Sequence, residues 1–220
     1  MTNEELVKKL VDEGYLRSLR VINAFKQVDR QNFVPEDLRD EAYVNAPLPI
    51  GFGQTISQPL TVAFMLELLQ PQPGDKVLDV GAGSGWQAAL LAHIVYGEPR
   101  RTMGPRGKVY ALEIIPELKE FGEQNIKKLG VKNIEFFCAD ARAGLAKFAP
   151  FNKIIGAAAS HEIPPALLKQ LAPNGPSTNS GQGRIVFPVD DALVLGIKSQ
   201  AGKIKFQKFP GFRFVPLVSH

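Results

Sequence analysis

Apolar side chains recur along the first thirty residues with the spacing of amphipathic helices. In residues 1–11 and 18–28 they return every three or four positions, which predicts two helices with one buried face each. Thr2 and Glu5 are spaced as a capping box at the start of the first helix. A short third helix is expected at residues 35–40. The pattern in residues 1–40 therefore predicts a layer of helices that covers the rest of the fold.

Residues 42–59 follow neither a helical nor a strand period, although they are rich in apolar and small side chains. Long segments without regular structure inside compact proteins are usually functional. We therefore expect a functional loop here. Pro59 suits the first turn of a helix that continues to Leu69, with Ser57 near its capping position.

From residue 76 onward, short apolar runs alternate with helical patterns. Four strands are expected, each typical of a sheet covered on both faces, at residues 76–80, 108–113, 134–138 and 151–157. The helices between them are expected at residues 87–95 and 116–129. A fifth strand and a hairpin follow, at residues 184–189, 192–198 and 203–209.

This order of elements predicts an α/β fold, with a doubly wound, mostly parallel sheet, an N-terminal helical cover and C-terminal antiparallel strands. Because no linker separates two cores, we expect one domain over residues 1–220. Within it, residues 1–70 form the N-terminal helices and the substrate loop. Residues 71–220 form the cofactor-binding core and the C-terminal strands.

A glycine-rich turn follows the first strand of this core. The dinucleotide fingerprint Gly-x-Gly-x-x-Gly requires a third glycine where this chain has Trp86, so the pattern is Gly-x-Gly-x-Gly. Such a turn after an acidic strand residue resembles the first motif of the class I methyltransferases. The resemblance implies Rossmann-like binding of S-adenosylmethionine, with S-adenosylhomocysteine as product, by Asp79, Gly81, Ala82, Gly83, Ser84 and Gly85.

Acidic residues end the next two expected strands. Glu113 stands where a carboxylate can accept hydrogen bonds from both ribose hydroxyls, the alternative being a solvated glutamate at a strand end. Asp140, followed by Ala141, stands where methyltransferases place the acid that reads the adenine amino group. The single cysteine, Cys138, lies in an apolar strand and is expected to be a buried hydrophobe and not a nucleophile.

Composition narrows the partners and the compartment. The chain has 26 basic and 22 acidic residues, a net charge of +4 and a pI near 9.1. Because the charges are dispersed along the chain, the basic pI is only weak evidence that it binds nucleic acid. One cysteine excludes a disulfide framework and suggests a reducing cytoplasm. No apolar run is long enough to cross a bilayer, and no histidine has metal-ligand spacing.

Two segments before the glycine turn carry a more specific resemblance. Residues 47–51 read Pro-Leu-Pro-Ile-Gly, residues 53–59 read Gly-Gln-Thr-Ile-Ser-Gln-Pro, and both are similar to the signature of the protein-L-isoaspartate O-methyltransferase family. Further matches, from Arg30 with Phe33-Val34-Pro35 to residues 214–217, extend the resemblance over nearly the whole chain. It implies catalytic roles for Thr55 and Ser57. Residues expected to contact substrate are Ile50, Gln54, Ile56 and His161, the last as a loop residue bordering the cleft and not a catalyst.

The chain departs from the family pattern in four places. Ala139 and Ala141 flank Asp140 where the family commonly has glycines. Residues 82–86 read Ala-Gly-Ser-Gly-Trp where Thr-Gly-Ser-Gly-Tyr is usual, and residues 156–159 read Gly-Ala-Ala-Ala where a Val-Thr-Ala-Ala-like run is more usual. Residues 174–183 enlarge a later turn, and the insertion at residues 97–107 explains the long spacing between the glycine turn and Glu113. These changes concern the substrate side more than the cofactor site.

The resemblance implies methyl transfer to the free carboxylate of L-isoaspartyl residues in damaged proteins and peptides, which initiates their repair. One alternative is a carboxyl methyltransferase acting on an Asp of a dedicated partner peptide. Another is a nucleic-acid methyltransferase, which is expected to show an Asn/Asp-Pro-Pro-aromatic turn where this chain has residues 159–162, Ala-Ser-His-Glu. A non-catalytic binding protein is a third alternative. We expect a monomeric cytoplasmic enzyme without metal, membrane or nucleic-acid partners.

Overall fold

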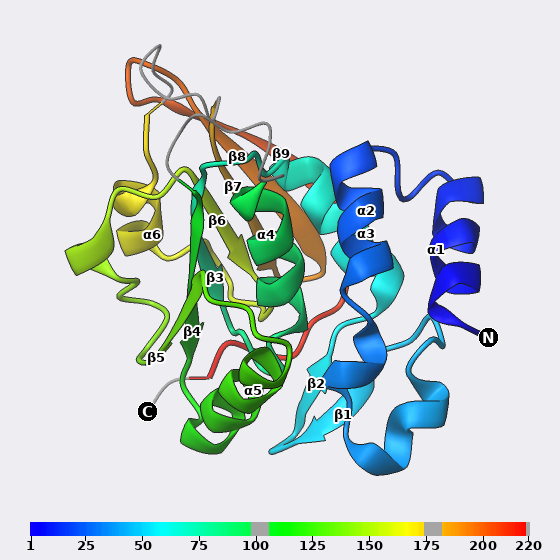
Figure 1. The fold of residues 1–220 in the computed structure, drawn as a ribbon. Coiled ribbons are helices and arrows are strands. Elements are labelled where there is room, and N and C mark those ends of the chain that lie inside the picture. The colour runs from blue at the N-terminus through cyan, green and yellow to red at the C-terminus, as the bar shows by residue number, and fades with distance from the viewer. Residues whose placement is uncertain (98–105, 174–181, 219–220) are drawn as a thin grey trace.

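A seven-stranded sheet forms the centre of the computed structural model, which describes residues 1–97, 106–173 and 182–218 (Figure 1). The strands lie in the order β5-β4-β3-β6-β7-β8-β9. Their bounds are β3 Lys76–Val80, β4 Lys108–Glu113, β5 Ile134–Cys138, β6 Lys153–Gly156, β7 Gly183–Val189, β8 Ala192–Lys198 and β9 Ile204–Pro210. The first five strands in this spatial order are parallel, and β8 pairs antiparallel with both β7 and β9. The predicted fold class is confirmed.

Helices cover both faces of this sheet because neighbouring strand residues point to opposite sides. Val77 packs into the cluster shared with α3 (Pro59–Leu69), α4 (Trp86–Tyr96) and α5 (Pro116–Lys128). Leu78 packs on the other face with Leu167 of α6 (Pro165–Gln170). Figure 1 shows α6 on the side of the sheet opposite α4.

The N-terminal helices form a further layer outside α3 and α4. Helix α2 (Leu19–Gln27) contacts both, and α1 (Asn3–Asp12) contacts α2. The predicted capping box is present, since Glu5 N–H donates to Thr2 Oγ1 and Thr2 N–H donates to Glu5 Oε2. The expected third helix is a 3₁₀ turn, η2 (Glu36–Glu41), and another, η1 (Arg30–Phe33), precedes it. Farther along the chain, η3 (Ala146–Phe148) is a third such turn.

The prediction of an irregular loop at residues 42–59 was wrong. Strands β1 (Leu48–Gly51) and β2 (Gln54–Ile56) pair into a short antiparallel hairpin. Its turn contains three successive residues with positive φ, namely Gly51, Phe52 and Gly53. Strands of four and three residues interrupted by proline and glycine carry too little alternation to be detected by period.

Ser57 lies next to the N-cap of α3, as predicted, but it does not cap the helix. The N-cap is Gln58, whose side chain accepts no capping hydrogen bond. Asn45 performs this role from outside the helix, because its Oδ1 accepts from Leu60 N–H at 3.0 Å. The Ser57 hydroxyl is therefore not needed by the helix.

The chain reverses direction across the sheet at β3. It proceeds from β3 to β4 and β5 on one side and then returns to β6 on the other side of β3. In open α/β sheets, ligands bind at such a switch point, outside the carboxyl ends of the strands. A ligand site is therefore expected at the loops after β3, β4, β5 and β6. Of the two insertions noted in the sequence, residues 98–105 and 174–181 lie outside the described residues.

Cys138 is exposed, and the expectation of a buried cysteine was wrong. It ends β5, which is the edge strand of the sheet.

Among the described helices, none is both long enough and apolar enough to cross a membrane.

Candidate active site

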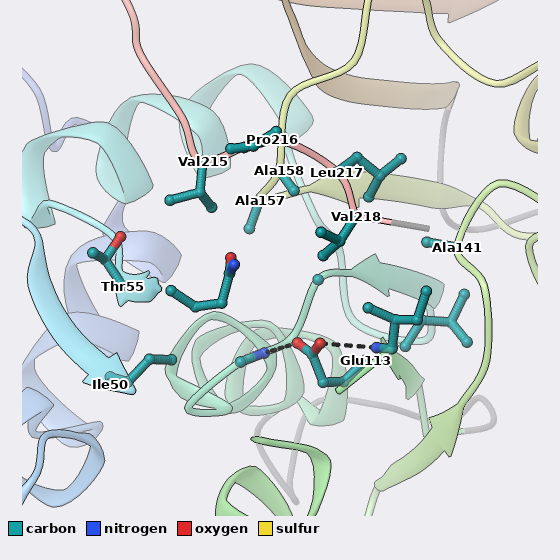
Figure 2. Close-up of a pocket in the computed structure, with 15 residues that line it drawn as sticks. Ile50, Thr55, Glu113, Ala141, Ala157, Ala158, Val215, Pro216, Leu217 and Val218 are labelled. Atoms are coloured by element: carbon teal, nitrogen blue, oxygen red, sulfur yellow. Dashed lines mark hydrogen bonds between the residues drawn. The ribbon is translucent and has the colours of Figure 1, made fainter. Parts of the chain in front are cut away.

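Two adjoining clefts open at the carboxyl ends of β3, β4 and β6. The space between the lining atoms, including the open solvent at the mouth, is about 510 Å³ in the first and about 310 Å³ in the second. They share Thr55, Gly81, Gly83 and Ala157, so they form one continuous depression. Figure 2 shows Ile50 and Thr55 on one side of the first cleft, with Glu113 and Ala141 across from them.

The glycine turn after β3 forms the floor of both clefts. Gly81, Gly83 and Gly85 all have positive φ, which explains the glycines at these positions. The N–H groups of Gly81 and Ala82 donate to Leu112 O, both at 2.9 Å, and thereby fix the turn against β4. Within the turn, Gly81 and Gly83 line both clefts, and Ala82 and Ser84 line the second. Gly85 lines neither cleft and is the N-cap of α4.

A glycine of α5 that the sequence analysis missed supports this turn from below. A Cβ built on Gly122 would lie 2.7 Å from Gly83 O and 2.9 Å from Phe136 Cε1. A Cβ on Gly85 would in turn lie 3.2 Å from Gly122 O. The helix and the turn therefore approach each other at a distance that only glycine permits. The available signal was a lone glycine inside an amphipathic helix, which costs about 1 kcal/mol relative to alanine.

Glu113 ends β4 and is held by backbone donors. Its Oε2 accepts from Gly83 N–H at 2.9 Å, and its Oε1 accepts from Ile114 and Ile115 N–H at 2.8 and 3.0 Å. Figure 2 shows the carboxylate between the glycine turn and the β4–α5 loop. Because a carboxylate offers about four acceptor positions, about one remains for a ligand while all three backbone bonds are present. A ligand that offers two hydroxyls must displace one of these bonds.

Asp79 lies in β3 beneath the turn and lines neither cleft. It is fully buried, and its Oδ1 accepts from Gln87 Nε2 at 2.7 Å. Burial raises the pKa of Asp79 to about 7, the Gln87 hydrogen bond opposes this rise, and the charge of Glu113 adds to it. Gln87 itself lines the second cleft. Asp79 is thus positioned to support the cleft wall and not to contact a ligand directly.

The loop after β5 contributes one lining residue. Ala141 lines the first cleft, whereas the neighbouring Asp140 does not. The Asp140 carboxylate accepts a hydrogen bond from Arg142 Nε–H that is shared between its two oxygens, and one from Arg142 Nη2 at 2.6 Å. This interaction also raises the pKa of Arg142. The acid expected to read adenine is therefore paired with a neighbouring guanidinium.

The β1–β2 hairpin forms the wall opposite Glu113. Ile50 and Gln54 line the first cleft, Thr55 lines both, and Ile56 and Ser57 line the second. Ile50 touches the glycine turn, since a Cβ on Gly83 would lie 3.1 Å from Ile50 Cδ1. Within the described residues, the Ser57 hydroxyl has no hydrogen-bond partner. The hairpin thus brings two hydroxyl side chains to the cleft that holds the glycine turn.

The C-terminal segment forms a further wall, which the sequence analysis did not assign to the site. Val215, Pro216, Leu217 and Val218 line the first cleft, and Figure 2 shows them passing across it. Ala159 fixes this segment, because its N–H donates to Val215 O at 2.8 Å and its carbonyl accepts from Leu217 N–H at 2.7 Å. Ala157 and Ala158, after β6, also line this cleft.

His161 is not brought into the clefts. Its ring is fully exposed, and Nδ1 lies 3.0 Å from Asp190 Oδ1. In the part of the chain that the structure describes, no cluster of three or more His, Cys, Asp or Glu side chains could hold a metal ion.

Comparison with known proteins adds an independent finding. The family model of protein-L-isoaspartate(D-aspartate) O-methyltransferase (PCMT) matches residues 1–220. A protein-L-isoaspartate O-methyltransferase of Methanopyrus kandleri is 44% identical over 98% of this chain and 90% of its own length. Protein-L-isoaspartate O-methyltransferase 2 of Archaeoglobus fulgidus is 43% identical over 97% of this chain and 91% of its own length.

A solved structure is similar over the whole fold. It is a PCMT protein of Plasmodium falciparum in complex with S-adenosyl-L-homocysteine, 25% identical, with a TM-score of 0.81 and 99% of each chain covered. The match of the family model over the full chain, together with relatives above 40% identity, establishes that this chain belongs to the protein-L-isoaspartate(D-aspartate) O-methyltransferase family.

Proposed function

We propose that this enzyme transfers a methyl group from S-adenosylmethionine to the free carboxylate of L-isoaspartyl residues, with Ser57 and Thr55 holding the acceptor. Membership of the family and the names of its relatives support this reaction. The product is a carboxyl methyl ester, whose formation initiates repair of the rerouted peptide bond.

The residues of the first cleft fit S-adenosylmethionine. Gly81 and Gly83 leave the floor without side chains, so a ligand can approach the backbone. The Glu113 carboxylate can accept from ribose, and Ala141 gives an apolar surface after β5. Asp140 would reach the adenine amino group only by sharing its oxygens with Arg142. The bound cofactor supplies an electrophilic methyl group on a sulfonium.

The acceptor side rests on the β1–β2 hairpin. Ser57 and Thr55 offer hydroxyl donors at the second cleft, and Ile50 and Ile56 are apolar and exclude water. The acceptor is an α-carboxylate with a pKa near ~3.5, so it is ionised at neutral pH and requires no general base. Catalysis then depends on orientation and water exclusion. His161 is not needed for proton transfer, which agrees with its exposure outside the clefts.

One observation carries the assignment of Ser57. Ser57 lines the same cleft as the glycine turn, while the capping of α3 is performed by Asn45. Capping of the helix therefore does not require a serine at this position. A hydroxyl that donates to an acceptor carboxylate would account for it.

Ser57→Ala tests the assignment. We expect turnover on an isoaspartyl peptide to fall by about 10- to 100-fold, while the affinity for S-adenosylhomocysteine stays within about twofold, because the lost donor faces the acceptor. Ser199→Ala, in the turn between β8 and β9, is the matched control and should behave as wild type. Full activity of Ser57→Ala would remove this serine from the acceptor site.

A pair of peptides that differ only in an isoaspartyl or a normal aspartyl residue distinguishes the proposed reaction from methylation of a dedicated aspartyl peptide. An isoaspartyl residue routes the backbone through its side chain, so its free carboxylate lies closer to the chain than that of a normal aspartyl residue. A wall that grips the peptide backbone aligns one of the two, and a misplacement of ~1 Å costs about 100-fold in rate. Equal single-turnover rates on isoaspartyl and aspartyl twins would favour a dedicated aspartyl-peptide enzyme.

We further propose that the enzyme acts as a cytoplasmic monomer and does not modify nucleic acid. The dispersed charge predicts that any binding to DNA or RNA is weak and is lost with added salt. Methyl groups appearing in nucleic acid at a rate comparable to peptide methylation would contradict this proposal. Light scattering at several protein concentrations tests the monomer.

A further inference from the structure

Arg30 is a fully buried cation behind the acceptor wall. Its Nη1 donates to Ala42 O at 2.6 Å and Val44 O at 3.4 Å. Its Nη2 donates to the carbonyl oxygens of Ala46, Ile56 and Ser57 at 3.0, 3.5 and 3.1 Å. One guanidinium thus joins both ends of the segment that contains the β1–β2 hairpin.

In the part of the chain that the structure describes, no carboxylate neutralises this charge. Among the described residues no Asp or Glu oxygen lies within 4.0 Å of the guanidinium, and Arg30 Nε is buried without a partner. Burial lowers the pKa of Arg30 to about 10, so the group remains charged at neutral pH. A buried unpaired cation is costly and is retained where its hydrogen bonds and charge have a use.

The same guanidinium also lies over the ring of Trp86. Its Cζ lies 5.3 Å from the centre of the Trp86 ring. Trp86 is the first residue of α4, directly after the glycine turn, and it lines the second cleft. A planar guanidinium can lie against an aromatic ring and, at the same time, donate hydrogen bonds to several carbonyl groups. A lysine ammonium cannot do both. Arg30 therefore contacts both the segment that carries the hairpin, through its hydrogen bonds, and the start of α4, through the Trp86 ring.

We infer that Arg30 is a positioning residue for methyl transfer, which sets the distance of Ser57 from the glycine turn by tying the β1–β2 hairpin to Trp86. The inference rests on the proposed role of the hairpin as acceptor site. Arg30 touches neither cleft and acts only through the Ser57 backbone and the Trp86 ring. Its positive charge behind the wall also favours the acceptor as a carboxylate.

Arg30→Lys tests this inference, because lysine keeps the positive charge but lacks the several N–H donors of the planar guanidinium. We expect turnover on an isoaspartyl peptide to fall about 100-fold, as for a ~1 Å displacement of the acceptor. The affinity for S-adenosylhomocysteine should stay within about twofold, since the glycine turn and Glu113 remain. Trp86 is the single tryptophan of the chain, so its emission should shift in the variant.

Two controls separate positioning from general stability. Arg184→Lys makes the same change at another arginine that donates to a backbone carbonyl, Leu68 O at 2.8 Å, outside both clefts, and should behave as wild type. Arg30→Met retains an apolar stem of similar length and keeps the test open should Arg30→Lys not fold, with the same loss of turnover expected.

Hydrogen exchange distinguishes failure of the inference from failure of the proposed function. In the Arg30 variants, amides of residues 42–57 should lose protection while those of β3 and β4 keep theirs. Such a loss, with a wild-type enzyme inactive on isoaspartyl peptide, would support Arg30 as the anchor and refute the acceptor role of the hairpin. Wild-type turnover in Arg30→Lys, or equal loss of turnover and S-adenosylhomocysteine affinity, would overturn the inference.

Discussion

Gly122→Ala tests whether α5 holds the glycine turn in place. In an ordinary helix interior this substitution raises stability by about 1 kcal/mol, because alanine is the better helix former. Here the added Cβ would lie 2.7 Å from Gly83 O, which is 0.7 Å closer than the 3.4 Å at which ordinary contact begins. The Phe136 ring, at 2.9 Å, blocks escape to the other side. The turn or the helix must therefore move.

The displacement falls on the group that binds Glu113. Gly83 presents its carbonyl to α5 and its N–H to Glu113 Oε2, so a shift that relieves the first contact disturbs the second. Overpacking costs about 1–3 kcal/mol; taken at about 2 kcal/mol, it outweighs the gain of about 1 kcal/mol in helix propensity and leaves a net loss of about 1 kcal/mol. We expect S-adenosylhomocysteine to bind about 10-fold more weakly, because the floor of the first cleft, where we propose that it binds, has moved.

Calorimetric titration with S-adenosylhomocysteine and urea unfolding measure these two effects. Gln124→Ala, on the exposed face of α5, is the matched control and should change neither quantity appreciably. A Gly122→Ala protein more stable than wild type, with unchanged affinity, would refute the argument that helix and turn are in contact here.

Two further predictions concern carboxylates near the turn. Glu113→Gln places an amide against Gly83 N–H, loses a charge-assisted bond and should weaken S-adenosylhomocysteine binding by about 2 kcal/mol, or about 30-fold, in a calorimetric titration. Glu135→Gln, in the ion pair with Lys108, is the control. The pKa of Asp79 is about 7 in the folded chain against an ordinary value of 3.8, so between these pH values the unfolded chain loses a proton that the folded chain keeps. The free energy of unfolding should therefore fall with rising pH by up to about 1.4 kcal/mol per unit in this window, and Asp79→Asn should lack that fall in urea unfolding; parallel profiles would contradict it.

The sheet and the glycine turn could be predicted because their signals are local. A run such as residues 76–80 is apolar on both faces, and the glycines that follow need positive φ whatever surrounds them. The β1–β2 hairpin left no comparable signal, because its strands are short and broken by proline and glycine. Cys138 was misjudged since an apolar strand does not reveal whether it lies at the centre or the edge of a sheet.

The contacts that complete the site join residues distant in sequence. Arg30 meets the carbonyls of Ile56 and Ser57 only after folding, and no pattern within residues 18–40 indicates five carbonyl acceptors. The capping of α3 by Asn45 is likewise a matter of tertiary structure, and the position of Ser57 next to the N-cap could not reveal it. Glu113 and the turn were assigned by order along the chain, but its three backbone donors were visible only in the structure.

The wall formed by Val215 to Val218 makes the order of synthesis matter. Glu113 and the glycine turn emerge first, and the segment that encloses them follows about one hundred residues later, a delay of roughly 5–20 s at ordinary rates of translation. Until β6 follows, β3 has no neighbour on that side of the sheet, and until residues 215–218 follow, the first cleft lacks a wall. A nascent chain therefore completes the first cleft only after these residues have been made, and products truncated before them should be unable to hold the methyl donor at the site that we propose.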